Sequence, residues 1–293
     1  MTIPKITQEM IKAYDDYTHL TLDRRGFMDK LTRLAGSGAA AAAIAPMLAA
    51  NQAHAAIVPA DDARVKSETV SWSGPAGELS GYLAVPAEAT GDLGTVIVIH
   101  ENRGLNPHLE DVARRLAVEG FLGLAVDLLS PLGGTPADED QARQMIAALD
   151  PAANLANLVA TVAFLKSHPM GNGKVGAIGF CWGGGAVNQL AVASPDLAAG
   201  VAYYGSQPPA ADVPKIKAHL LLHYAGLDDR INAGIPAYEE ALKSAGIDYT
   251  LYMYEGANHA FNNDTSAARY DKEAADLAWS RSIAFFTEAL ATG

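Results

Sequence analysis

Short apolar runs with strand character recur along the chain from residue 65 onward. Val65–Trp72 and Leu79–Pro86 read as two strands joined by the turn Gly74–Gly77, which predicts an antiparallel hairpin. Thr95–His100 is a continuous run rich in Val and Ile, typical of a strand buried on both faces. Further strands are expected at Phe121–Val126, Lys174–Phe180, Ala199–Tyr204, His219–Tyr224 and Tyr249–Tyr254.

Amphipathic segments of helical length alternate with these strands. His108–Glu119 places Leu109, Val112 and Leu116 on one face, and Gly120 ends it. Other helices are expected at Asp138–Leu149, Leu155–Lys166, Gly183–Ala193, Pro236–Ser244 and Ala267–Ala291. A leading hairpin followed by repeated strand–helix units predicts an α/β fold, with a mostly parallel central sheet, helices on both faces and one domain over residues 56–293.

Residues 1–55 have a different character. Arg24 and Arg25 precede a weakly apolar stretch over Leu34–Ala50, and Ala53-His54-Ala55 follows it. This pattern resembles a bacterial twin-arginine export signal with cleavage after Ala55, which predicts a periplasmic or secreted protein. The alternative is a retained arm with an Ala-rich helix on a cytoplasmic protein. The apolar stretch is too short for a membrane span, so no stable membrane insertion is expected after processing.

Composition narrows the classes of partner. Residues 1–55 hold six of the 21 basic and five of the 33 acidic side chains. Residues 56–293 therefore carry 15 basic and 28 acidic side chains, a net charge of −13. An acidic body repels phosphate backbones, so nucleic acid is not expected as a partner. Nothing in the sequence predicts the oligomeric state.

The single cysteine cannot form an intramolecular disulfide, and its surroundings suggest chemistry. Cys181 lies in the stretch Gly-Phe-Cys-Trp-Gly-Gly-Gly over 179–185, between a predicted strand and a predicted helix. A nucleophile on such a sharp turn stands above the sheet edge, as in α/β-hydrolases, and glycines permit the close backbone approach. The helix dipole favours a thiolate there, and the N–H of Trp182 can stabilise an oxyanion. The alternative is a buried structural cysteine.

A nucleophile needs a base and a group that orients the base. The strand His219–Tyr224 leads to Asp228 and Asp229, and the strand Tyr249–Tyr254 leads to His259. This is the order nucleophile, acid, histidine that the fold requires. Asp228 is the expected acid with Asp229 as its competitor, and His259 is the expected base.

The loop after the buried strand Thr95–His100 supplies a fourth element. It reads Glu101-Asn102-Arg103-Gly104, and in this fold it provides the second oxyanion N–H, here from Asn102. Four motifs then resemble the dienelactone hydrolase (carboxymethylenebutenolidase) family of the α/β-hydrolase superfamily. They are His-Glu-Asn-Arg-Gly at 100–104, Gly-Phe-Cys-Trp-Gly-Gly at 179–184, Gly-Leu-Asp at 226–228 and Tyr-Glu-Gly-Ala-Asn-His-Ala-Phe at 254–261.

The resemblance implies a carboxylic ester hydrolase that opens a lactone or ester without a cofactor. It implies that Glu101 keeps the resting thiol of Cys181 protonated and accepts its proton when substrate binds. Cys181 would then form a thioester, and His259, held by Asp228, would activate the hydrolytic water. Alternatives are a general carboxylesterase or thioesterase of the same fold, and a binding protein that has lost the chemistry.

The substrate side of the resemblance is weaker. Family members hold the carboxylate of dienelactone with arginines, one of them shortly after the catalytic histidine, whereas this chain has Asn262, Asn263 and Asp264 there. Arg103 could supply a cation instead, and Phe261 is a second candidate for substrate contact. His219 and His223 are four residues apart on a strand with no third ligand nearby, so no metal site is expected.

Overall fold

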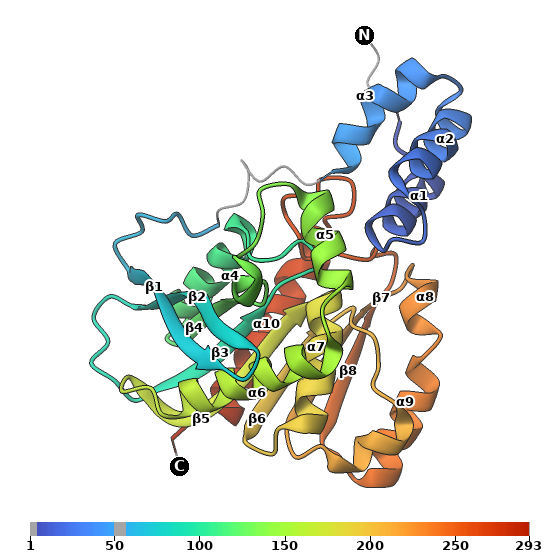
Figure 1. The fold of residues 1–293 in the computed structure, drawn as a ribbon. Helices are drawn as coiled ribbons and strands as arrows, with labels where there is room; N and C mark the ends of the chain where they lie inside the picture. Colours follow the sequence, from blue (N-terminus) through green and yellow to red (C-terminus); the bar gives the residue numbers. More distant parts are fainter. Residues whose placement is uncertain (1–4, 50–56, 293) are drawn as a thin grey trace.

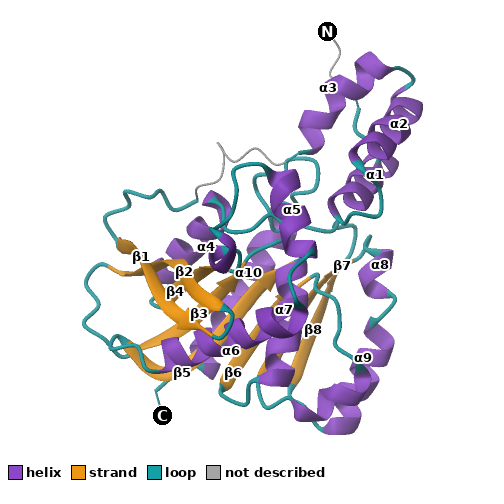
Figure 2. Ribbon diagram, in the orientation of Figure 1, coloured by secondary structure: helices purple, strands orange, loops and turns teal. Residues whose placement is uncertain are grey.

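The computed structural model describes residues 5–49 and 57–292. An eight-stranded sheet forms its centre, in the order β1-β2-β4-β3-β5-β6-β7-β8 (Figure 2). β1 and β2 form an antiparallel hairpin, β2 also pairs antiparallel with β4, and all other neighbours are parallel. The strands are β1 (Val65–Gly74), β2 (Gly77–Pro86), β3 (Leu93–Ile99), β4 (Leu122–Asp127), β5 (Gly171–Phe180), β6 (Leu197–Tyr203), β7 (His219–Ala225) and β8 (Tyr249–Tyr254).

Helices cover both faces of this sheet because its central strands are apolar on both sides (Figure 1). Side chains of α6, α7 and α9 pack in one core, and those of α4 and α10 pack in the other. The helices that follow the hairpin are α4 (Pro107–Val118), α5 (Glu139–Ala147), α6 (Pro151–Lys166), α7 (Trp182–Ala193), α8 (Asp229–Asn232), α9 (Ile235–Ala245) and α10 (Lys272–Ala289), with 3-10 turns η2 (Ser130–Leu132) and η3 (Ala210–Lys215).

Three helices precede the sheet: α1 (Gln8–Thr18), α2 (Arg24–Ala35) and α3 (Gly38–Leu48). We call residues 5–49 the N-terminal segment. The segment has a small apolar core of its own, and it lies beyond α5 and the connection from β7 to α8 (Figure 1). The core residues are Met10, Ile11, Ala13, Tyr14, Phe27, Leu31, Ala41, Ile44 and Leu48.

The fold class predicted from the sequence is confirmed, including the hairpin and the parallel sheet. The start of the last helix was wrong. α10 begins at Lys272 rather than Ala267, because the side chain of Asp271 accepts a hydrogen bond from Ala274 N at 3.1 Å and caps the helix. Residues 262–270 form turns instead.

One part of the predicted export signal lies within the described residues and another part lies outside them. Arg24 and Arg25 begin α2, whose N-cap is Asp23. The expected cleavage motif Ala53-His54-Ala55 lies outside the described residues. Across the described ranges, no single helix has the length and apolar character to cross a membrane, although the bent pairs α2 with α3 and α5 with α6 satisfy the same criteria together.

Candidate active site

Cys181 stands on a strained turn between β5 and α7. Its φ of 56° and ψ of −114° place it in a conformation that residues with a side chain rarely adopt. The glycines beside it are required by contact: a Cβ on Gly183 would lie 2.3 Å from the carbonyl oxygen of Ile99, and one on Gly184 would lie 2.5 Å from that of Tyr203. The turn therefore presses the start of α7 against the ends of β3 and β6, and it presents the thiol at the sheet edge.

Asp228 and His259 meet at the ends of β7 and β8. His259 Nδ1 lies 2.5 Å from Asp228 Oδ2, and both side chains are buried. Asp229 is the exposed first residue of α8, so Asp228 is the carboxylate that orients the imidazole. Burial opposes the charge on Asp228, but the hydrogen bond and the charge of His259 lower the pKa of its carboxyl group.

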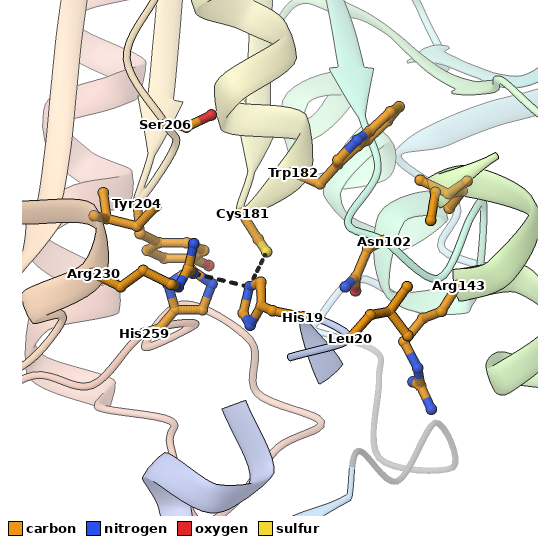
Figure 3. Close-up of a pocket in the computed structure, with 13 residues that line it drawn as sticks. His19, Leu20, Asn102, Arg143, Cys181, Trp182, Tyr204, Ser206, Arg230 and His259 are labelled. Carbon is orange, nitrogen blue, oxygen red and sulfur yellow. Dashed lines mark hydrogen bonds between the residues drawn. The ribbon is translucent and has the colours of Figure 1, made fainter. Parts of the chain in front are cut away.

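The thiol of Cys181 is flanked by two imidazoles. His19 Nε2 lies 3.3 Å from Sγ, and the rings of His19 and His259 meet edge to face at 4.8 Å (Figure 3). Burial alone would raise the pKa of Cys181, but the charges of His259 and His19 lower it to about 6. The thiolate and Asp228 outweigh burial at His259 and raise the pKa of that imidazole to about 10. The surroundings thus favour a reactive thiolate.

The loop after β3 is anchored by buried charges. The carboxylate of Glu101 accepts a hydrogen bond from Asn263 Nδ2 at 2.8 Å, and the partner of Cys181 Sγ is His19 rather than Glu101. Burial opposes the charge on Glu101, but Arg103 and other neighbouring cations lower its pKa. Arg103 is itself buried, with Nη2 donating to Tyr14 Oη at 3.2 Å.

A cavity of about 200 Å³ opens over Cys181 (Figure 3). A second one of about 530 Å³ adjoins it and shares Ile146, Ala147, Trp182 and Ser206. Together they leave room for a small organic ester beside the sulfur. The first cavity is lined by His19, Leu20, Asn102, Arg143, Ile146, Ala147, Cys181, Trp182, Tyr204, Ser206, Arg230, Ile231 and His259.

The candidates named from the sequence divide into two groups. Cys181, His259, Asn102 and Trp182 line the cavity, and Asp228 contacts His259 from behind. Glu101, Arg103 and Phe261 do not line the cavity; Phe261 packs among Tyr203, Tyr204 and Tyr254.

Two arginines that sequence reasoning missed, Arg143 and Arg230, line the cavity. Arg143 is buried and pairs with Asp140 and Glu139, whereas Arg230 is exposed. The negative charge of Asp264, in the stretch where the family resemblance implies an arginine, does not face the cavity, because Asp264 binds His108 at 3.0 Å and Arg115 at 3.3 Å. The signal for Arg230 is its position two residues after Asp228; Arg143 lies within α5 and carries no comparable signal.

Tyr204 and His19 were also missed. Tyr204 comes directly after β6, where a strand-end residue could have been noted, and its buried Oη has no hydrogen-bond partner in the described protein. His19 caps the C-terminus of α1, in the segment whose sequence resembles an export signal.

Backbone strain collects around this cavity. Five non-glycine residues with positive φ occur in the described ranges, and four of them belong to the site or adjoin it: Leu20, Cys181, Tyr204 and Ala260. Such conformations persist where surrounding structure holds them, and they concentrate at functional sites. Leu20 shows that the N-terminal segment shares this property.

One group of side chains in the described residues has the composition of a metal site. Single ligand atoms of His19, Cys181 and His259 lie within 4.8 Å of one another. Arg230 Nη2, however, lies 3.0 Å from His19 Nε2, and its guanidinium opposes a metal ion, which adds positive charge to the site, whereas proton transfer from the sulfur to a nitrogen leaves the net charge unchanged. The arrangement suits proton transfer at sulfur better than metal binding.

Comparison with known proteins places this geometry in a family. The model of the dienelactone hydrolase family matches residues 79–290. A Saccharolobus solfataricus protein named "Putative carboxymethylenebutenolidase" is 34% identical over 226 residues, covering 65% of this chain and 87% of its own. The crystal structure of a dienelactone hydrolase-like promiscuous phosphotriesterase from metagenomic libraries has a TM-score of 0.70 at 26% identity, over 78% of this chain and 100% of that one. The dienelactone hydrolase of Anabaena variabilis gives 0.60 at 25% identity, over 78% and 100%.

Proposed function

Because the chain belongs to the dienelactone hydrolase family, we propose that it cleaves a carboxylic ester or lactone through a triad of Cys181, His259 and Asp228. One observation carries the proposal: the buried Asp228–His259 pair meets a strained, thiolate-favouring cysteine at the floor of a cavity. A structural cysteine or a pure binding site has no need of this combination.

The reaction divides into two halves. The thiol of Cys181 loses its proton and the sulfur attacks the carbonyl carbon; the bond from carbon to the leaving oxygen breaks, that oxygen takes up the proton, and a thioester remains. Water then attacks the thioester while His259 accepts its proton, and the carbon–sulfur bond breaks. We assign the N–H groups of Trp182 and Asn102 to the oxyanion of both halves, and each such donor contributes about 3–4 kcal/mol. The first N–H groups of a helix lack intrahelical partners, which leaves that of Trp182 available.

We assign Glu101 a positioning role in this scheme. Its carboxylate binds Asn263 and lies near Arg103, so it fixes the loop that carries the N–H of Asn102. The thiol contact that the family resemblance implies for Glu101 is made by His19.

The lining of the cavity points to a substrate that bears an acidic group. Arg230 and Arg143 both line it; Arg143 is already paired with Asp140 and Glu139, so Arg230 is the guanidinium that we expect to bind a carboxylate by charge-assisted hydrogen bonds. We therefore propose small esters or lactones with a carboxylate as the substrate class. Neutral carboxylic esters and thioesters are the second candidate, favoured by the largely apolar second cavity with Leu155, Leu158 and Trp182.

Cysteine replacement tests the nucleophile. Cys181→Ala should lose hydrolysis of p-nitrophenyl acetate and of a dienelactone to the background rate, with an unchanged unfolding transition. Intact-protein mass spectrometry of the unsubstituted enzyme should detect an acyl adduct that Cys181→Ala does not form. Retained turnover by a folded Cys181→Ala protein would contradict the proposal. No adduct across a panel of activated esters would favour a binding protein.

Arginine replacement tests the substrate class. Arg230→Gln should raise KM for a carboxylate-bearing lactone about tenfold, because one charge-assisted contact contributes about 1.5 kcal/mol or more. The matched uncharged lactone serves as control, and its KM should stay within about twofold. An equal change for both lactones would refute carboxylate binding by Arg230.

A further inference from the structure

His19 brings a second imidazole to the sulfur of Cys181 from outside the four sequence motifs of the catalytic domain. Its Nε2 lies 3.3 Å from Cys181 Sγ, within hydrogen-bond distance for sulfur (Figure 3). The ring is half-buried, and Leu20 beside it lines the cavity with a φ of 60°. The tip of the N-terminal segment is therefore part of the wall around Cys181.

The contacts of His19 define the tautomer of its neutral ring. Nδ1 lies 2.7 Å from the carbonyl oxygen of Asp15, which can only accept, so Nδ1 carries the hydrogen. Arg230 Nη2 lies 3.0 Å from Nε2, and a guanidinium can only donate. Both contacts place the lone pair on Nε2, where Arg230 and the thiol of Cys181 are the two hydrogen-bond donors, so Nε2 gives up its bond to Arg230 when it takes the proton of the thiol.

His259 is arranged differently. Its Nδ1 is held by Asp228, while its buried Nε2 has no hydrogen-bond partner among the described residues. Glu101 is engaged with Asn263. His19 Nε2 thus lies within hydrogen-bond distance of the thiol, while His259 acts on the thiol through its charge and keeps Nε2 for another proton.

Side chains of the catalytic domain hold the segment in this place. Asp15 Oδ1 binds Arg269 Nη1 at 2.8 Å, and the guanidinium of Arg269 stacks over the ring of Tyr14 at 5.0 Å. Asn102 Nδ2 donates to the carbonyl oxygen of Thr18 at 2.5 Å, which ties the oxyanion loop to the last turn of α1. Two loops that follow strands, the loop after β3 and the turns after β8, therefore contact the residues around His19.

Resting on the proposed function above, we propose that the N-terminal segment remains attached in the working enzyme and that His19 is a catalytic residue for acylation. His19 Nε2 accepts the proton of Cys181, the sulfur attacks the carbonyl carbon, and the departing oxygen takes that proton as its bond to carbon breaks. In deacylation His259 accepts a proton from water and returns it to the sulfur as the thioester breaks. Each histidine then serves one half of the reaction.

The competing proposal is cleavage after Ala55 with export of the remainder, which would remove His19 from the enzyme. N-terminal sequencing of the active protein isolated from its native cells separates the two. Residues of the segment at the start of the active protein support the proposal, and a start after Ala55 overturns it.

The kinetic test uses the full chain with p-nitrophenyl acetate in rapid mixing. His19→Gln keeps an amide of similar reach but cannot take a proton, so acylation should slow about a hundredfold while deacylation stays within about twofold. His19→Ala leaves space at the sulfur, and added imidazole should restore a large part of its acylation rate. His219→Gln, an exposed histidine paired with Asp248 far along the sheet, is the matched control and should change neither step.

These outcomes separate this inference from the proposed function. Acylation by His19→Gln at the unsubstituted rate, or equal slowing of both steps without imidazole rescue in His19→Ala, would overturn the role of His19. Loss of turnover in Cys181→Ala with a normal His19→Gln enzyme would leave the triad in place and remove only His19. Retained turnover in Cys181→Ala would refute the triad itself.

Discussion

The strand-end loops and the N-terminal segment meet at one sulfur atom, but different forces hold them there. Backbone hydrogen bonds continue the sheet into the loops: Cys181 N donates to Tyr203 O at 3.0 Å, and Gly226 N donates to Tyr254 O at 2.8 Å. In the described chain, the segment joins the rest without a backbone–backbone hydrogen bond. Its polar anchors are side chains such as Arg269 and Asn102.

This difference predicts different sensitivities. A strand-end residue is placed by a ladder that spans the whole sheet, so only a change in the backbone or in the residue itself disturbs it. The segment depends in part on ion pairs, which weaken as salt screens them. Catalysis that uses His19 should therefore fall with ionic strength sooner than the fold unravels.

The largest expected effect comes from the strand-end base. His259→Ala should slow deacylation about 10²–10⁴-fold, because no other oriented base remains for the water. Acylation should proceed, so the thioester should accumulate and appear by intact-protein mass spectrometry after mixing with p-nitrophenyl acetate. Steady turnover close to that of the unsubstituted enzyme would mean that the two histidines are interchangeable, which would break the contrast between the regions.

The same contrast explains what the sequence could predict. The positions of Cys181, Asp228 and His259 after strands could be predicted from the sequence. The apolar pattern locates each strand, and the order of the strands along the chain fixes which loops meet at the sheet edge. The choice between Asp228 and Asp229 depended on a distance, since both could cap α8. His19 could not be found, because it reaches the site through side-chain packing of a separate helix.

The turns before α10 show the same limit. The apolar pattern suggested a helix from Ala267, but residues 262–270 fold around Asn263 and Arg269, whose partners Glu101 and Asp15 lie far away in the sequence. Tertiary contacts of this kind override local preference, and no local pattern records them.

The next effect concerns packing in each region. Gly183→Ala should lower the free energy of unfolding by about 1–3 kcal/mol, because the new Cβ meets backbone carbonyls that cannot move freely. Gly38→Ala is the matched change in the segment, where a Cβ meets nothing within 4 Å, and it should stabilise α3 by up to about 1 kcal/mol. Urea unfolding measures both. A tolerated Gly183→Ala would show that the turn can relax.

The pH dependence of thiol alkylation compares the two histidines directly. With the pKa of Cys181 lowered to about 6, its reaction with iodoacetamide should rise through pH 6, well below the value of about 8.5 for an ordinary cysteine. Above this pH the thiolate is present, and below it the thiol is. Removing either imidazole, by His19→Ala or His259→Ala, should move the midpoint upward, because both lower the pKa of the thiol.

The distant histidine again provides the control, since His219→Ala should leave the alkylation midpoint unchanged. A midpoint that moves in His259→Ala alone would show that the segment does not influence the thiol in solution. The strand-end loops would then form the catalytic site alone, and the N-terminal segment would have no part in it.

The smallest expected effect is the coupling between Asp15 and Arg269, which links the two regions. The atoms are 2.8 Å apart, and the side chains are 20% and 3% exposed, so a double-mutant cycle with Asp15→Asn and Arg269→Gln should give about 1 kcal/mol in the free energy of unfolding. The pair Lys30–Asp16 lies within the segment and is more exposed, so its cycle should give less than about 0.5 kcal/mol. Because Asp15 also carries the carbonyl that orients His19, loss of the ion pair should slow acylation and leave deacylation unchanged. Coupling in stability without that kinetic effect would mean that the segment docks on the domain but does not serve its chemistry.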